Sequence, residues 1–109
     1  MTEDEARPQL DELRVLIDGL DRDIVKLLND RMRVVEDIGR IKRLAGLPIY
    51  EPKREDQVFA NVTGVNHGPL SEEGVRRIFE RIIDDMRTIQ RLRMESGAGR
   101  EACPADGEK

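Results

Sequence analysis

Positive charges interrupt the apolar face of a predicted helix in the first half of the chain. The apolar residues of residues 24–42 recur at helical spacing and include Ile24, Leu28, Val35 and Ile38. At about 100° per residue, Arg31 and Lys42 fall within the same narrow sector, and Arg14 lies at the edge of the stripe that precedes them. A buried charge without a partner costs several kcal/mol, so these cations predict a common ligand.

Two further stretches with helical spacing carry a polar residue on the apolar side. Glu55 lies three and seven residues before Val58 and Val62, and Gln90 lies four residues after Met86. Three cations suit a small molecule with two carboxylates, because arginine binds a carboxylate in a bidentate manner. A glutamate accepts a hydrogen bond from a hydroxyl, and a glutamine offers a neutral donor.

Each polar residue also has an ordinary structural interpretation. An arginine at a helix seam can fix the packing register or extend to water, and Glu55 with Arg31 could form a plain buried ion pair. Four such exceptions within the apolar faces of three helices favour a shared polar ligand, and they are Arg31, Lys42, Glu55 and Gln90. The sequence lacks a nucleophile with a base, since His67 lies in a Gly/Pro turn and Cys103 in the C-terminal tail. We therefore expect no metal or cofactor, and a reaction that depends on binding and electrostatics.

Composition favours one helical domain. The 109 residues are 39% charged and 3% aromatic, and their net charge of -4 argues against binding to a nucleic acid. No apolar run is long enough for a membrane span, and the acidic N-terminus has no secretory signal pattern. A single cysteine cannot form an internal disulfide, so we expect a cytoplasmic protein.

The spacing of apolar residues predicts an all-α chain of one long and two shorter helices. The predicted segments are a flexible N-terminal arm (1–8), helices at about 9–45, 52–64 and 71–94, and a disordered tail (95–109). Gly46 and Pro48 should end the first helix, Pro52 should open the second, and Ser71 should cap the third.

The length of the first helix predicts an oligomer. About 36 helical residues span about 54 Å, whereas a compact chain of this size has a radius of gyration of about 13 Å. The rest of the chain cannot cover such a helix. We therefore expect a homodimer in which two long helices cover each other.

Three stretches carry a specific pattern over about residues 10–92. They are LDELRVLIDGLDRDIVKLLNDRMRVVEDIGRIK, PIYEPKRE and RRIFERIIDDMRTIQ. In this order they resemble the all-helical class of chorismate mutases. The resemblance implies an intertwined homodimer of three-helix chains with active sites shared between chains. It also implies the rearrangement of chorismate to prephenate, in the shikimate pathway to phenylalanine and tyrosine, without a cofactor.

The resemblance also implies roles for individual residues. Arg31 would bind the ring carboxylate of chorismate, and Arg14 would reach the other carboxylate from the partner chain. Lys42 and Gln90 would contact the ether oxygen. Glu55 would receive the ring hydroxyl.

Four other positions complete the implied site. The backbone near Glu51 would help to hold the hydroxyl, Arg54 would support the carboxylate end, and Ile38 would form an apolar wall. Two positions depart from the family. Met86 stands where some members have a serine that holds the ring carboxylate, and Glu51 replaces the more usual aspartate.

Two other functions remain open from the sequence. An isochorismate-pyruvate lyase of the same fold would use a similar cationic pocket, and a helical adaptor or regulatory dimer would have no chemistry at all. The two tails could dock a shikimate-pathway enzyme, or they could only aid solubility.

Overall fold

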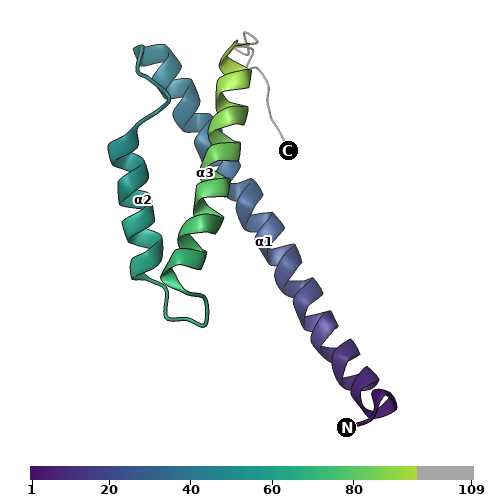
Figure 1. Cartoon of the computed structure of the whole chain (residues 1–109). Helices are drawn as coiled ribbons and strands as arrows, with labels where there is room; N and C mark the ends of the chain where they lie inside the picture. Colours follow the sequence, from purple (N-terminus) through teal and green to yellow (C-terminus); the bar gives the residue numbers. More distant parts are fainter. Residues whose placement is uncertain (96–109) are drawn as a thin grey trace. The chain divides into compact units, whose positions relative to one another are not determined.

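The computed structural model describes residues 1–95, which contain three helices joined by two loops (Figure 1). The helices are α1 (Glu3–Ala45), α2 (Pro52–Gly64) and α3 (Glu72–Glu95). Residues 1–95 contain no strand, which confirms the prediction of an all-α chain with one long and two shorter helices. The predicted tail lies outside the described residues, apart from Glu95, the last residue of α3.

The first helix begins earlier than predicted, so residues 3–8 are helical and do not form the expected flexible arm. The backbone N–H of Thr2 donates to the Glu5 carboxylate (2.9 Å), and the Glu5 N–H donates to the Thr2 hydroxyl (3.2 Å). This reciprocal capping box satisfies two N–H groups at the helix start. The prediction relied on Pro8 as a boundary, but Pro8 lies inside α1 and removes only one N–H from the helix.

The end of α1 is set by a glycine, as predicted. Gly46 has a φ of 70°, and its N–H donates to the Arg43 carbonyl (3.3 Å). The Leu47 N–H donates to the Lys42 carbonyl (2.8 Å), which completes a Schellman motif. This motif reverses the chain one turn after Lys42, so the following loop returns past the Lys42 side chain.

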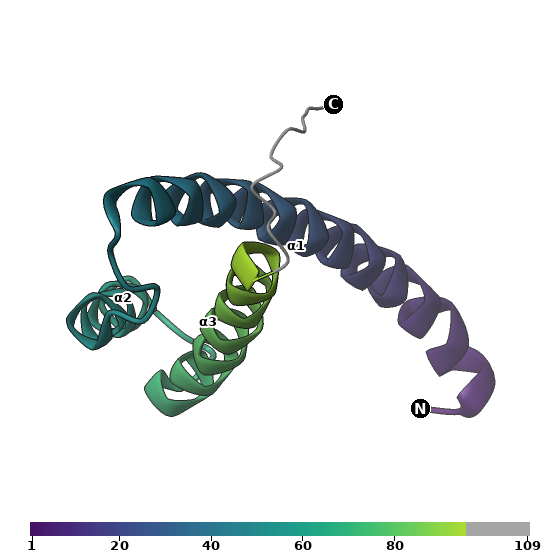
Figure 2. The same ribbon diagram turned by 90° about the horizontal axis from the view of Figure 1, so that it is seen from above.

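The two shorter helices also start at the predicted residues. Pro52 is the first residue of α2, and the Ser71 hydroxyl accepts a hydrogen bond from the Gly74 N–H (2.9 Å) at the start of α3. Helices α2 and α3 lie side by side (Figures 1 and 2). No helix within residues 1–95 is both long and apolar enough to span a membrane.

The chain divides into two units, Met1–Val34 and the residues from Val35 onward. In the second unit, Val75 and Met86 (each 8% exposed) are the buried apolar side chains among the described residues, and Gln90 (7%) is the buried polar one. In the first unit, an apolar stripe at helical spacing along α1 is largely exposed. Its residues are Leu10 (44%), Leu13 (57%), Ile17 (54%), Leu20 (57%), Ile24 (52%) and Leu27 (63%).

Candidate active site

Lys42 is held against the loop that follows α1. Its side chain is 13% exposed, and Nζ donates to the Ile49 carbonyl (2.9 Å). Nζ also forms an ion pair with Oε1 of Glu51 (2.6 Å). The Glu51 side chain is thus the carboxylate that orients Lys42. The result is a lysine with a fixed position at the C-terminal end of α1.

Glu55 projects from the first turn of α2 and forms an ion pair with Arg87 of α3. Both side chains are about one quarter exposed, at 24% and 25%. Arg87 also donates to Asp84 (2.7 Å), and its guanidinium lies 4.9 Å from the centre of the Tyr50 ring. Arg87 therefore connects α2, α3 and the loop before α2, and its charge offsets that of Glu55.

Gln90 is the most buried of the predicted site residues. Its Nε2 donates to the backbone carbonyl of Val35 on α1 (2.9 Å), and Met86 lies one turn earlier on α3. Ile38, on the same helix as Val35 and Lys42, keeps 44% of its surface exposed. Met86 is buried, at 8% exposed, and its side chain carries no hydroxyl.

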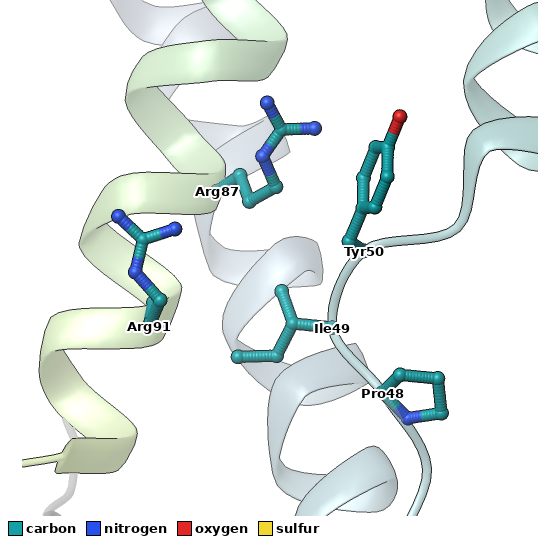
Figure 3. Close-up of a pocket in the computed structure, with 5 residues that line it drawn as sticks. All are labelled: Pro48, Ile49, Tyr50, Arg87 and Arg91. Carbon is teal, nitrogen blue, oxygen red and sulfur yellow. The ribbon is translucent and has the colours of Figure 1, made fainter.

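A pocket opens beside this network in the second unit (Figure 3). Its volume is about 570 Å³, within the range of small-molecule sites, and it is lined by Pro48, Ile49, Tyr50, Arg87 and Arg91. In Figure 3, Arg87 and Tyr50 point toward each other from α3 and from the loop, and the Ile49 side chain points toward α3. The pocket combines apolar walls with two guanidinium groups.

The remaining predicted residues lie elsewhere on the surface or in the first unit. Arg54 donates to Gln57 (3.2 Å) on the exposed side of α2. Arg14 belongs to the first unit, where it lies 3.8 Å from Asp11 with 70% of its side chain exposed. Arg31 also belongs to the first unit and is half-buried. The structure thus groups Lys42, Glu51, Glu55 and Gln90 in one unit.

The sequence predicts that the polar residues on the apolar faces share a polar ligand, and the structure adds within-chain contacts that the sequence did not predict. Lys42, Glu55 and Gln90 all have partners in the chain. These partners lie in a loop or on another helix. The periodicity of a single helix therefore cannot identify them.

Arg87 was not among the residues predicted from the sequence. This residue follows Met86 directly and therefore lies beside the apolar line of α3. A signal was available, since Glu55 on the inner side of α2 needs a cation and α3 offers arginines one turn apart at Arg87 and Arg91.

This arrangement suits the binding of an anion and the stabilisation of developing negative charge. Lys42 and Arg87 supply oriented cationic donors, each paired with a glutamate, and Gln90 supplies a neutral donor in a buried position. Within residues 1–95, no group of three or more His, Cys, Asp or Glu side chains is placed to hold a metal ion.

Comparison with known proteins identifies the family. The model of the chorismate mutase type II family matches residues 13–91, a range that includes every predicted site residue. The bifunctional chorismate mutase/prephenate dehydratase of Aquifex aeolicus is 34% identical over 87 residues, which cover 76% of this chain and 24% of that protein. The chain thus spans about a quarter of the length of this relative.

Two solved structures share the fold. Chorismate mutase (Form II) from Thermus thermophilus has a TM-score of 0.75 and 36% identity, covering 76% of this chain and 94% of that chain. Chorismate mutase from Helicobacter pylori in complex with prephenate has a TM-score of 0.75 and 27% identity, covering 81% and 96%. From the match over residues 13–91 and these relatives, the chain belongs to the chorismate mutase type II family.

Proposed function

We propose that the protein catalyses the rearrangement of chorismate to prephenate. The observation that carries this proposal is the family match over residues 13–91. It is supported by the similarity to the Helicobacter pylori enzyme, which was solved with prephenate bound. Fixed cations and a buried amide donor suit this reaction, in which one C–O bond breaks while one C–C bond forms within a dianion.

The first task of the site is conformational. Chorismate must fold its enolpyruvyl arm over the ring before the new C–C bond can form. We assign this task to Arg31, which binds the ring carboxylate, and to the partner chain's copy of Arg14, which binds the side-chain carboxylate. Holding the reacting carbons near their attack distance can lower the barrier by several kcal/mol.

The second task is electrostatic. As the C–O bond stretches, negative charge grows on the ether oxygen, and Lys42 and Gln90 are the donors that we assign to it. Lys42 is already oriented by Glu51 and the Ile49 carbonyl, so little reorganisation is needed when substrate binds. Neither donor forms a covalent bond with the substrate.

An assay with purified protein tests the proposal directly. Chorismate should disappear with stoichiometric formation of prephenate, and incubation with isochorismate should release no pyruvate. Pyruvate from isochorismate without prephenate from chorismate would instead identify a lyase. Failure to bind chorismate at all would favour an adaptor without chemistry.

We also propose that the active form is a homodimer. Val75 and Met86 are the buried apolar side chains within residues 1–95, a small core for a folded domain, and the stripe of the first unit from Leu10 to Leu27 is exposed. An exposed apolar stripe on a long helix fits the same stripe of a second copy. In this dimer each active site would receive Arg14 from the other chain.

A pair of substitutions on α1 tests the dimer. Ile24 and Val15 are both exposed in the single chain, at 52% and 66%, and nine residues of helix place them about 180° apart. Ile24→Asp introduces a charge into the proposed interface and should abolish the dimer. Val15→Asp should leave the dimer intact. Light scattering should give about 25 kDa for the native protein, twice the chain mass of 12.5 kDa.

Equal masses for the Ile24→Asp and Val15→Asp proteins would contradict this interface. A native mass of one chain at micromolar concentration would remove the shared site itself, because the partner's Arg14 would then be absent.

Arg87→Ala should weaken substrate binding, because it leaves the negative charge of Glu55 without its partner near a dianion. For a pair that is about one quarter exposed, we expect a loss of about 1.4 kcal/mol, which is about tenfold in KM. Arg87→Lys should recover part of the affinity, since it restores the charge without the bidentate geometry.

The matched control is Arg81→Ala on the same helix. Arg81 pairs with Asp85 (3.1 Å) and its side chain is 81% exposed, so its removal should not change KM. Steady-state kinetics with chorismate distinguish the two variants. An unchanged KM in Arg87→Ala would show that Glu55 does not face the substrate.

A further inference from the structure

Gly39 is the buried residue of α1, and it faces Gln90 of α3. A Cβ placed on Gly39 would lie 2.9 Å from both Cγ and Nε2 of Gln90 and 3.3 Å from its Cδ. At this distance, either the added Cβ or the Gln90 side chain would have to move. The Gln90 side chain therefore occupies the space that any other residue at position 39 would fill.

Glycine weakens the interior of a helix, so its presence at this buried position calls for a packing reason. Gly19, the other interior glycine of α1, shows no such crowding. A Cβ there would meet its nearest neighbour, the Arg22 guanidinium, at 3.8 Å, which is an ordinary contact. The two glycines of one helix thus differ in what they accommodate.

The position of Gln90 leaves one donor for a ligand. An amide nitrogen carries two N–H groups, and Nε2 of Gln90 gives one of them to the Val35 carbonyl (2.9 Å). Val35 lies one helical turn before Gly39, so the carboxamide lies along the backbone of this turn. Within residues 1–95, the second N–H has no hydrogen-bond acceptor, although Gln90 is only 7% exposed. A buried donor without an acceptor points to a bound molecule.

We propose that Gly39 is a positioning residue for Gln90. The absence of a side chain at position 39 lets the carboxamide lie against α1, with one N–H on Val35 and the other directed at the ether oxygen of the substrate. This role rests on the proposed chorismate mutase function. A methyl group at position 39 displaces the amide, and a displacement of about 1 Å can cost about a hundredfold in rate.

Gly39→Ala tests the proposal through the split between kcat and KM. We expect kcat to fall by about ten- to a hundredfold, with KM changed less than about threefold, because the carboxylate-binding arginines are untouched. Gly19→Ala is the matched control on the same helix and should keep the native kcat. If Gly39 were needed only for stability, Gly39→Ala would lower the fraction of active enzyme and leave kcat per active site unchanged. Active-site titration should therefore accompany the kinetics.

The decisive measurement adds Gly39→Ala to Gln90→Ala, where the colliding atoms are absent. In this background Gly39→Ala should change kcat less than about twofold, and it should raise Tm, as the replacement of a helical glycine normally does. In the native background it should lower Tm. The double variant should fold even if Gly39→Ala alone does not.

Two outcomes overturn the proposal: an unchanged kcat in Gly39→Ala, or an equal fall in kcat with and without the Gln90 amide. A native protein that forms no prephenate would instead refute the proposed function, and the catalytic part of this proposal with it. The opposite Tm shifts, measured without substrate, test the contact separately.

Discussion

Lys42→Ala is expected to lower kcat by about 10²–10³ while KM changes little. The ammonium group interacts most strongly with the ether oxygen when the C–O bond is partly broken, so its loss affects the transition state more than bound chorismate. The structure strengthens this expectation, since Nζ is fixed by the Ile49 carbonyl and Glu51. A donor that is oriented before substrate arrives loses little entropy in the reaction.

Lys26→Ala is the control for the charge change. Lys26 lies on α1 and pairs with Asp30 (2.8 Å), and its side chain is 74% exposed. The hydrogen bond from Lys26 is the main cause that lowers the pKa of Asp30, so the lysine has a surface role. Chorismate consumption at saturating and limiting concentrations separates kcat from KM. If Lys42→Ala raised only KM, Lys42 would be a binding group and the electrostatic mechanism would be wrong.

The helix boundaries that were predicted well from the sequence depend on local chemistry. Gly46 adopts a positive φ at the end of α1, Pro52 opens α2 and Ser71 caps α3, and each signal acts within a few residues. The start of α1 depends on local chemistry too. The reciprocal Thr2 and Glu5 bonds follow from a pattern in the sequence, but Pro8 gave a competing boundary signal five residues later than the true start.

For Gln90, burial was predictable from the sequence, but the contacts around it were not. Helical spacing placed Gln90 on the inner line of α3, and its burial confirms that placement. The spacing could not show that Arg87 reaches Glu55, or that Gly39 accommodates the Gln90 amide, because these contacts need the approach of two helices. Sequence periodicity identifies a face, whereas a partner depends on tertiary packing.

The largest effect expected from the dimer is recovery of activity from two inactive proteins. Arg14→Ala and Arg31→Ala should each be nearly inactive, since each loses a carboxylate contact at both sites. In a hybrid dimer, one site carries both substitutions and the other carries neither. Random exchange of subunits makes about half of the dimers hybrid, so a mixture should regain about a quarter of native activity.

The pattern of recovery identifies which residues of one active site come from the same chain. Arg14→Ala should also recover activity with Lys42→Ala, because Arg14 would come from one chain and Lys42 from the other. Arg31→Ala and Lys42→Ala should not recover activity together, since both residues would belong to the same chain at each site and every hybrid site would lack one of them. Native mass spectrometry would confirm that hybrids form in all three mixtures. If hybrids form and Arg14→Ala recovers with neither partner, then each chain builds its own site and the proposed exchange of Arg14 between chains is wrong.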